Sequence, residues 1–355
     1  MKKQFFLIGC FFLIFLSGIG RLQASAQEPV TLGPSRMIEL AVLNNLDFKI
    51  ALVQLENTRL EVQKMEAENL LSESTLSDLQ KEITLLGQQN QFQLEKDQLF
   101  IKVVDDYFRL LMAEKEIESQ EQNVELEEII LESVEKQVAA GYSIDLNLLQ
   151  QGNEYYDALF SYQESMLNHQ QLIMEVKNSL GLPREQDIRL TEMALPGFPE
   201  INLEEAIQQA SKNSVALKSQ SLKINQAERE LEKARVSDDS GIEIKKLENN
   251  FTIAQLEKSL SQHDLDDQVE TQWLKYNQAK NAITLSQKSL EEIRENESMI
   301  RQQVQAGLRT DEELLSATIG VLDAQSRLIS SVRQVYQAYL ELHRLMGTLD
   351  KGVLP

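Results

Sequence analysis

The sequence predicts an all-α protein built as a tandem repeat of long coiled-coil helical hairpins. The first observation behind this prediction is the spacing of the prolines, because residues 35–182 and 200–354 contain none. Uninterrupted runs of that length, rich in Glu, Gln, Leu, Lys and Ala, are typical of long helices. The second is the low aromatic content of 6%, and the third is a pair of matching glycine segments.

The matching segments are VAAGYSID, Val138–Asp145, and VQAGLRTD, Val304–Asp311, whose glycines lie 166 residues apart. Glycine adopts the left-handed conformation that ends a helix at little cost, so each segment predicts a turn between two helices. Thr310 and Glu313 have the spacing of a capping box for the helix that follows. Ser143 is predicted to cap the equivalent helix of the first copy, with Asp145 in its first turn.

Apolar heptads predict the helix before each turn. They occupy six consecutive positions in the first copy and five of six in the second, where Glu297 interrupts. The first set is Val103, Leu110, Ile117, Val124, Leu131 and Val138, and the second is Val269, Tyr276, Ile283, Leu290, Glu297 and Val304. After each turn apolar residues follow at alternating steps of four and three, which is the spacing of a coiled-coil seam. The seams stop at Gly181 and Gly347, again 166 residues apart.

These boundaries divide the chain. We expect a signal peptide over 1–26, a first helical-hairpin repeat over 27–181, a linker with three prolines over 182–202, a second repeat over 203–348 and a tail over 349–355. Lys2 and Lys3, the apolar run Phe5–Leu16 and Ala24-Ser25-Ala26 predict export with cleavage, and an uncleaved membrane anchor is the alternative.

Charge and composition exclude several classes of function. The formal net charge of −21 argues against nucleic acid and anionic membrane surfaces as partners. Cys10, the single cysteine, falls in the predicted signal peptide. His169, His263 and His343 lack metal-ligand spacing, and there is no phosphate-binding glycine loop or nucleophile elbow. We therefore predict no enzyme and no catalytic, cofactor or metal site, and interpret Tyr107 and Trp273, at matching repeat positions, as packing residues.

One heptad position differs between the copies. It is acidic in the first copy and basic or neutral in the second, which suggests either a solvated face or faces that pair across repeats in an assembly. The residues are Glu114, Glu121, Glu128 and Glu135, against Lys280, Gln287, Arg294 and Arg301.

The order of these motifs resembles the TolC-like outer-membrane efflux family over nearly all of the predicted mature chain. The segments that carry the resemblance are IELAVLNN (Ile38–Asn45), DDYFRLL (Asp105–Leu111), VAAGYSIDLNLLQ (Val138–Gln150), NSLGLP (Asn178–Pro183), VQAGLRTDEELLSA (Val304–Ala317) and LMGTL (Leu345–Leu349). The resemblance implies a homotrimer that forms a helical conduit in the cell envelope. It also implies a periplasmic adaptor (a membrane fusion protein) and an inner-membrane pump as partners in tripartite efflux or type I secretion.

By position, the resemblance assigns adaptor docking or gating to the two hairpin tips. The tip residues are Gly141, Tyr142, Ser143, Asp145, Gly307, Leu308, Arg309, Thr310, Asp311 and Glu313. Family members also carry membrane-spanning strands in each repeat. Here the corresponding segments, Leu70–Leu99 and the residues after Val236, show almost no alternation and read as helix continuation or a helical turn around Gly87 and Gly241. We therefore expect little or no β-barrel, and direct membrane insertion is doubtful.

Two other classes of function stay open. One is a structural coiled-coil protein of the envelope, and the other is a degenerate family member without transport activity. The matching glycine turns favour the conduit, since an ordinary coiled coil does not need them.

Overall fold

The computed structural model describes residues 29–69, 75–193, 195, 197–350 and 354. The predicted signal peptide lies outside the described residues. Within them the chain is almost entirely helical, which confirms the all-α prediction. The first repeat holds α1 (Pro34–Asn44), α2 (Leu46–Asn69), α3 (Thr75–Ala139) and α4 (Asp145–Leu180). The second holds α5 (Leu203–Asn213), α6 (Val215–Val236), α7 (Gly241–Gln305) and α8 (Asp311–Leu345).

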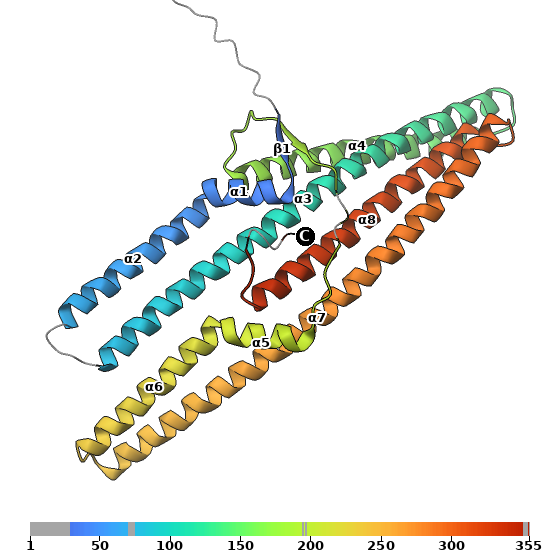
Figure 1. Ribbon diagram of the computed structural model, residues 1–355. Helices are drawn as coiled ribbons and strands as arrows, with labels where there is room; N and C mark the ends of the chain where they lie inside the picture. The colour runs from blue at the N-terminus through green and yellow to red at the C-terminus, as the bar shows by residue number, and fades with distance from the viewer. Residues whose placement is uncertain (1–28, 70–74, 194, 196, 351–353, 355) are drawn as a thin grey trace, which may run out of the picture.

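The long helices form a single layer, which Figure 1 shows face on. Toward the glycine turns the order across the layer is α4, α3, α8, α7, and toward the opposite end it is α2, α3, α6, α7. We call these parts the tip half and the far half. Each neighbour runs antiparallel to the next, because α3 and α7 cross the whole layer and the shorter helices return beside them. The helices α2 and α7 therefore form the two open edges of the far half, and α4 and α7 those of the tip half.

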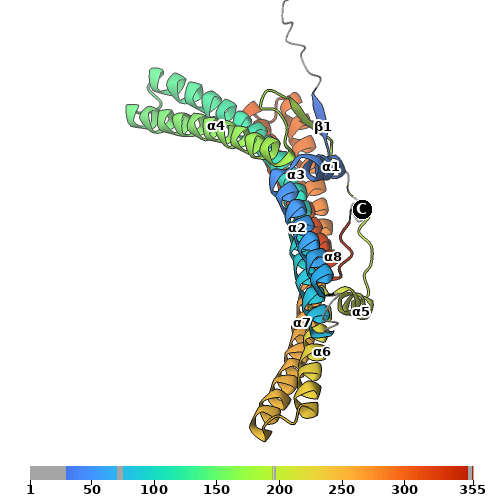
Figure 2. The same cartoon turned by 90° about the vertical axis from the view of Figure 1, so that its left-hand side faces the viewer.

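One face of the layer carries the remaining elements. Figure 2 shows α1, α5 and β1 on one side, and the layer bends away from them. We call the opposite side the bare face. The strands β1 (Val30–Leu32) and β2 (Ile188–Leu190) pair in parallel. The sequence did not predict this pairing, because segments of three residues are too short to show alternation.

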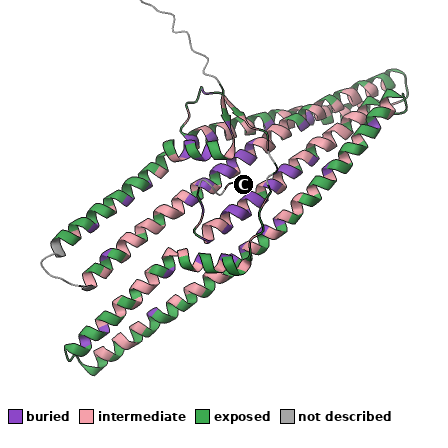
Figure 3. Ribbon diagram, viewed as in Figure 1, coloured by how far each residue is buried: buried purple, intermediate pink, exposed green. Residues whose placement is uncertain are grey.

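The core lies at mid-height of the layer, where the purple residues of Figure 3 concentrate. Phe198 of the linker packs edge-on against Tyr276, Tyr336 and Tyr339. Tyr107 donates its hydroxyl hydrogen bond to the Thr191 carbonyl oxygen at 2.9 Å, and Trp273 donates from Nε1 to the Ile201 carbonyl oxygen at 2.7 Å. The interpretation of Tyr107 and Trp273 as packing residues is confirmed, and the pair also fixes the linker at two points.

In each repeat, an asparagine at the end of the short first helix bonds to the end of the last helix. Asn44 Nδ2 donates to the Leu180 carbonyl oxygen at 3.2 Å, and Asn213 Nδ2 donates to that of Met346 at 2.8 Å. The next residues, Gly181 and Gly347, have φ of 63° and 65°. A Cβ at Gly181 would lie 2.5 Å from the Cβ of Asn44, and one at Gly347 would lie 2.8 Å from that of Asn213. Both glycines are therefore required by the backbone angle and by the close asparagine.

The segments that lack strand alternation are helical where the structure describes them. The helix α3 continues through Gly87, so no turn forms there. In the second repeat the chain turns over Ser237–Ser240, with Asp238 at φ 55°, and Ser240 caps α7 by accepting from the Glu243 amide at 3.3 Å. Residues 70–74 lie outside the described residues. In the described part of the chain, no helix has the length and apolarity needed to cross a membrane.

The charged faces of the two copies do not meet within one chain. They lie on α3 and α7, which α8 separates in the tip half. Arg301 instead pairs with Glu297 on its own helix, and Lys280 pairs with Glu200 of the linker at 2.6 Å. The hypothesis that these faces pair in an assembly concerns contacts between chains, and it stays a prediction.

Candidate functional site: hairpin tips and grooves

The first tip ends α3 through a tight backbone turn. Gly141 has φ of 77° and donates its amide to the Val138 carbonyl oxygen at 3.0 Å, while Tyr142 donates to that of Gln137 at 2.8 Å. These two bonds form a Schellman motif, which pairs carbonyls that the helix end leaves open. A Cβ at Gly141 would meet nothing within 4 Å. The glycine is needed here for its backbone angle alone.

The second tip repeats the motif and adds side-chain capping. Gly307 has φ of 70°, and Leu308 donates to the Gln303 carbonyl oxygen at 2.8 Å. Thr310 Oγ1 accepts from the Glu313 amide at 3.3 Å, and Glu313 Oε2 accepts from the Thr310 amide at 3.1 Å. The predicted capping box is confirmed. Arg309 reaches the other carboxylate oxygen of Glu313 at 3.3 Å, so the box also orients this guanidinium.

The predicted cap of the first tip is wrong. The N-cap of α4 is Ile144, which has no side-chain acceptor, and Ser143 Oγ instead accepts from Asn147 Nδ2 at 3.0 Å. The 166-residue offset places Ile144 at the position of Thr310 and Ser143 at that of Arg309. Ser143 therefore lies one residue too early to reach the amides of the first turn. Asp145 and Asp311 each lie in the first turn of their helix, as expected.

Both tips present apolar side chains to solvent. Tyr142 is 86% exposed and Leu308 is 76% exposed. Large exposed apolar side chains at the end of a long hairpin are suited to contact with another protein. Figure 2 shows the end of the α3–α4 hairpin apart from that of the α7–α8 hairpin. The structure therefore groups the predicted residues as two separate tips.

A groove next to the second tip was not predicted. It has a volume of about 620 Å³, and its apolar lining residues include Ile130, Ile293 and Ile300. Arg309 and Glu313 line the same groove, which lies between α3, α7 and α8. Sequence spacing could not reveal it, because Ile130 comes from the other repeat and only the layer order brings it to α8.

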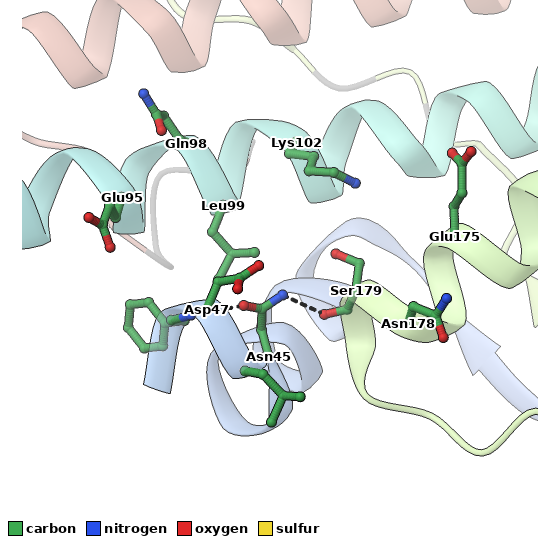
Figure 4. Close-up of a pocket in the computed structure, with 11 residues that line it drawn as sticks. Asn45, Asp47, Glu95, Gln98, Leu99, Lys102, Glu175, Asn178 and Ser179 are labelled. Atoms are coloured by element: carbon green, nitrogen blue, oxygen red, sulfur yellow. Dashed lines mark hydrogen bonds between the residues drawn. The ribbon is translucent and has the colours of Figure 1, made fainter. Parts of the chain in front are cut away.

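A second groove lies where α4 ends and α2 begins, shown in Figure 4. Asn45 Nδ2 donates to the Ser179 carbonyl oxygen at 3.1 Å and spans the junction. Asp47, Glu95 and Glu175 give the lining an acidic character. Lys102, also in the lining, pairs with Asp106.

A half-buried ion pair connects α3 to α8. Arg333 binds Asp105 through two nitrogens, at 2.6 and 3.1 Å. Burial raises the pKa of Asp97 from its ordinary 3.8 to about 6, against the lowering effect of Lys96 and of a hydrogen bond from Gln93. Burial also lowers the pKa of His343 from 6.5 to about 4. The Arg333–Asp105 pair joins the two repeats, while His343 contacts Thr348 and Tyr339 of its own repeat. Within the described residues there is no cluster of side chains that could hold a metal ion.

Comparison with known proteins identifies the fold. The sequence matches no protein-family model and no curated protein. The structure is similar to the outer-membrane channel OprN, with a TM-score of 0.63 and 11% identity over 89% of this chain and 90% of that chain. It is similar to the CmeC outer membrane channel of Campylobacter jejuni, with a TM-score of 0.64 and 11% identity over 90% of this chain and 87% of the other. VceC of Vibrio cholerae aligns with a TM-score of 0.62 and 10% identity over 88% and 96%.

These neighbours are TolC-family outer-membrane efflux channels. At such low identity the likeness establishes the fold. The chain has the helical TolC-like fold that the motifs of the sequence predict, with both hairpin repeats in place.

Proposed function

We propose that the protein is a subunit of a homotrimeric helical conduit in the cell envelope, part of a tripartite efflux or type I secretion system. The observation that carries the proposal is a layer one helix thick, with a bare face on its concave side and two open edges. A layer of this shape buries its edges only against another chain. The fold of known efflux channels supports the same interpretation.

Ring closure follows from the order of the helices. Joining α7 of one copy to α4 and α2 of the next continues the antiparallel alternation without a break. The edges also carry the expected side chains, because Tyr156 and Phe160 on α4 and Leu285 on α7 are each at least 65% exposed in the single chain. Contiguous exposed apolar rows on a soluble surface mark interaction sites.

The partners and location of the assembly are part of the proposal. The two tips dock a periplasmic adaptor, and an inner-membrane pump supplies the substrate from the other side of that adaptor. The signal peptide exports the chain to the envelope. The chain acts as a passage and is not an enzyme.

The test is the mass and shape of residues 27–355 in solution. A ring of three chains with a central opening in end-on electron micrographs supports the conduit. A monomer or an extended two-chain coiled coil at micromolar concentration contradicts it, and favours a structural envelope protein. A ring that binds no adaptor encoded beside it in the genome points instead to a family member without transport activity.

A further inference from the structure

Two apolar rows on the edges of the far half have the same spacing. On α2 the row is Leu46, Ile50 and Val53, and on α7 it is Ile253, Leu256 and Leu260. All six side chains are between 51% and 72% exposed in the single chain. The steps are four and three along α2, and three and four along α7. Read in opposite directions the two rows are identical, as an antiparallel coiled-coil contact requires.

Both rows point sideways out of the layer. At 100° per residue, the α2 row lies about 150° around the helix, and so nearly opposite, from Ala51, Leu55 and Val62, which are buried on the side toward α3. The α7 row lies on average about 230° around the helix from buried Ala254. Each row therefore faces away from the neighbour that its helix already has, toward the space beyond the edge.

The heights of the two rows also agree. Phe48 packs against Phe92, which sets the level of α2 beside α3, with ring centroids 5.4 Å apart. The 166-residue offset carries Phe92 to Lys258 on α7. Because α2 and α7 run antiparallel, each residue before Phe48 on α2 lies level with the residue the same number of steps after Lys258 on α7. Leu46 therefore lies level with Leu260. The same count places Ile50 level with Leu256, and Val53 level with Ile253.

The repeats are nearly level, so this count is meaningful. Within the first repeat, Gln151 of α4 hydrogen-bonds to Glu127 of α3, which by antiparallel counting puts residue 159 of α4 level with Ser119. If α8 lay at the same height beside α3, the 166-residue offset would put residue 325 of α8 level with Ser119. Ser119 in fact hydrogen-bonds to Asp323 at 3.0 Å. The difference of two residues is a height difference of about 3 Å. Neighbouring copies in the ring are related by a rotation about an axis that runs along the helices, and this rotation leaves the height of each residue along that axis unchanged. The α2 row of one copy and the α7 row of the next therefore meet within about half a helical turn.

We infer that these rows form the contact between adjacent copies in the far half, with α2 of one copy packed on α7 of the next. The occupant of each open edge is thus a second copy of this chain. This inference rests on the proposed ring and adds its register: Leu46 on Leu260, Ile50 on Leu256 and Val53 on Ile253. The contact between α2 and α7 closes the ring in the far half.

Disulfide trapping in the mature chain tests the register. Residues 27–355 contain no cysteine, so Ile50→Cys with Leu256→Cys in one chain introduces the only thiols. Oxidation is expected to link most chains into covalent oligomers. The matched control is Ile50→Cys with Lys245→Cys, which lies 11 residues, about 16 Å, out of register and is expected to link at least tenfold less. Equal linking of both pairs, or none of the first pair within an intact ring, overturns the register.

Charge replacement tests whether the contact holds the ring. Ile50→Lys alone and Leu256→Glu alone are expected to weaken assembly at least tenfold by sedimentation, with helicity unchanged. The two changes in one chain place Lys opposite Glu at every contact and are expected to restore assembly. Single variants that assemble as the parent does, or a double variant weaker than both, overturn the inference while the ring itself stands. A parent chain that stays monomeric contradicts the proposed function instead.

Discussion

Asn213 donates its side-chain amide to the carbonyl oxygen of Met346, 2.8 Å away, and so ties the end of α5 to the end of α8. Asn44 makes the same bond to Leu180 in the first repeat. These contacts fill the space beside Gly181 and Gly347. They distinguish the glycines at mid-height from those at the tips, which have open space beside them.

Gly181→Ala is expected to destabilise the protein more than Gly141→Ala. Both substitutions force alanine into the left-handed region, at about 1–2 kcal/mol each. Only Gly181→Ala also places a methyl group 2.5 Å from Asn44, and overpacking of this kind costs about 1–3 kcal/mol more. Urea unfolding of residues 27–355 measures the difference. Gly152→Ala is the control, because this open helical position should gain about 0.5–1 kcal/mol. Equal losses at Gly181 and Gly141 would show that the asparagine contact is unimportant.

Thr310→Ala is expected to loosen the second tip by about 1 kcal/mol, because the variant loses an N-cap bond. Ser143→Ala should have almost no effect on the first tip, since Ser143 caps nothing there. Hydrogen exchange at the amides of the first turns of α8 and α4 reports each effect locally. Faster exchange at the start of α4 in Ser143→Ala would contradict the assignment of Ile144 as the cap.

Arg309→Ala is expected to weaken adaptor binding at least tenfold. The guanidinium lines the same groove as Ile130, Ile293 and Ile300, where it can meet an acidic group of the partner. Tyr142→Ala and Ser143→Ala, at the other tip, are expected to lower the affinity less. The measurement is equilibrium binding of the assembled ring to its adaptor. Similar losses for all three variants would mean that both tips dock equally.

Asp97→Asn is expected to stabilise the protein at pH 8. The pKa of Asp97 is about 6 in the folded chain and 3.8 in the absence of burial, so the folded state binds the proton more tightly. The contribution of this group to stability is therefore greatest below pH 4 and is lost as the pH rises through 6, a change on the order of 3 kcal/mol. Asparagine removes that loss, which urea titrations at pH 4 to 8 measure. A variant as pH-dependent as the parent would contradict the assignment.

His343 has the opposite dependence. Its pKa of about 4 in the fold lies below the ordinary 6.5, so its contribution is complete above pH 6.5 and is lost as the pH falls toward 4. In the parent the two groups partly cancel between pH 4 and 6.5. Asp97→Asn is therefore expected to expose a steeper loss of stability on acidification. His343→Gln in that background should remove it.

Local signals account for what the sequence predicted. The glycine turns, the capping box at Thr310 and the heptads of α3 and α7 each depend on residues within about two helical turns of one another. The prediction that Ser143 caps α4 is wrong because the glycine does not by itself fix which residue begins the next helix. A shift of one residue decides whether the serine hydroxyl reaches the backbone amides of the first turn. The 166-residue offset from Thr310, the N-cap of α8, indicates Ile144 as the N-cap of α4.

Long-range relationships account for the rest. The pairing of Val30–Leu32 with Ile188–Leu190 joins segments too short to have a pattern. Separation of the charged faces of α3 and α7 depends on α8 lying between them, which heptad spacing does not encode. The groove at Arg309 combines helices from both repeats, and the buried Asp97 follows from where α8 ends beside α3.

The mass of residues 27–355 at micromolar concentration, measured together with end-on electron micrographs, tests the central claim most directly. The account predicts a particle with three times the mass of one chain, closed into a ring around the bare faces. A stable monomer over the same concentrations would contradict it, because the open edges of the layer would then need no second copy.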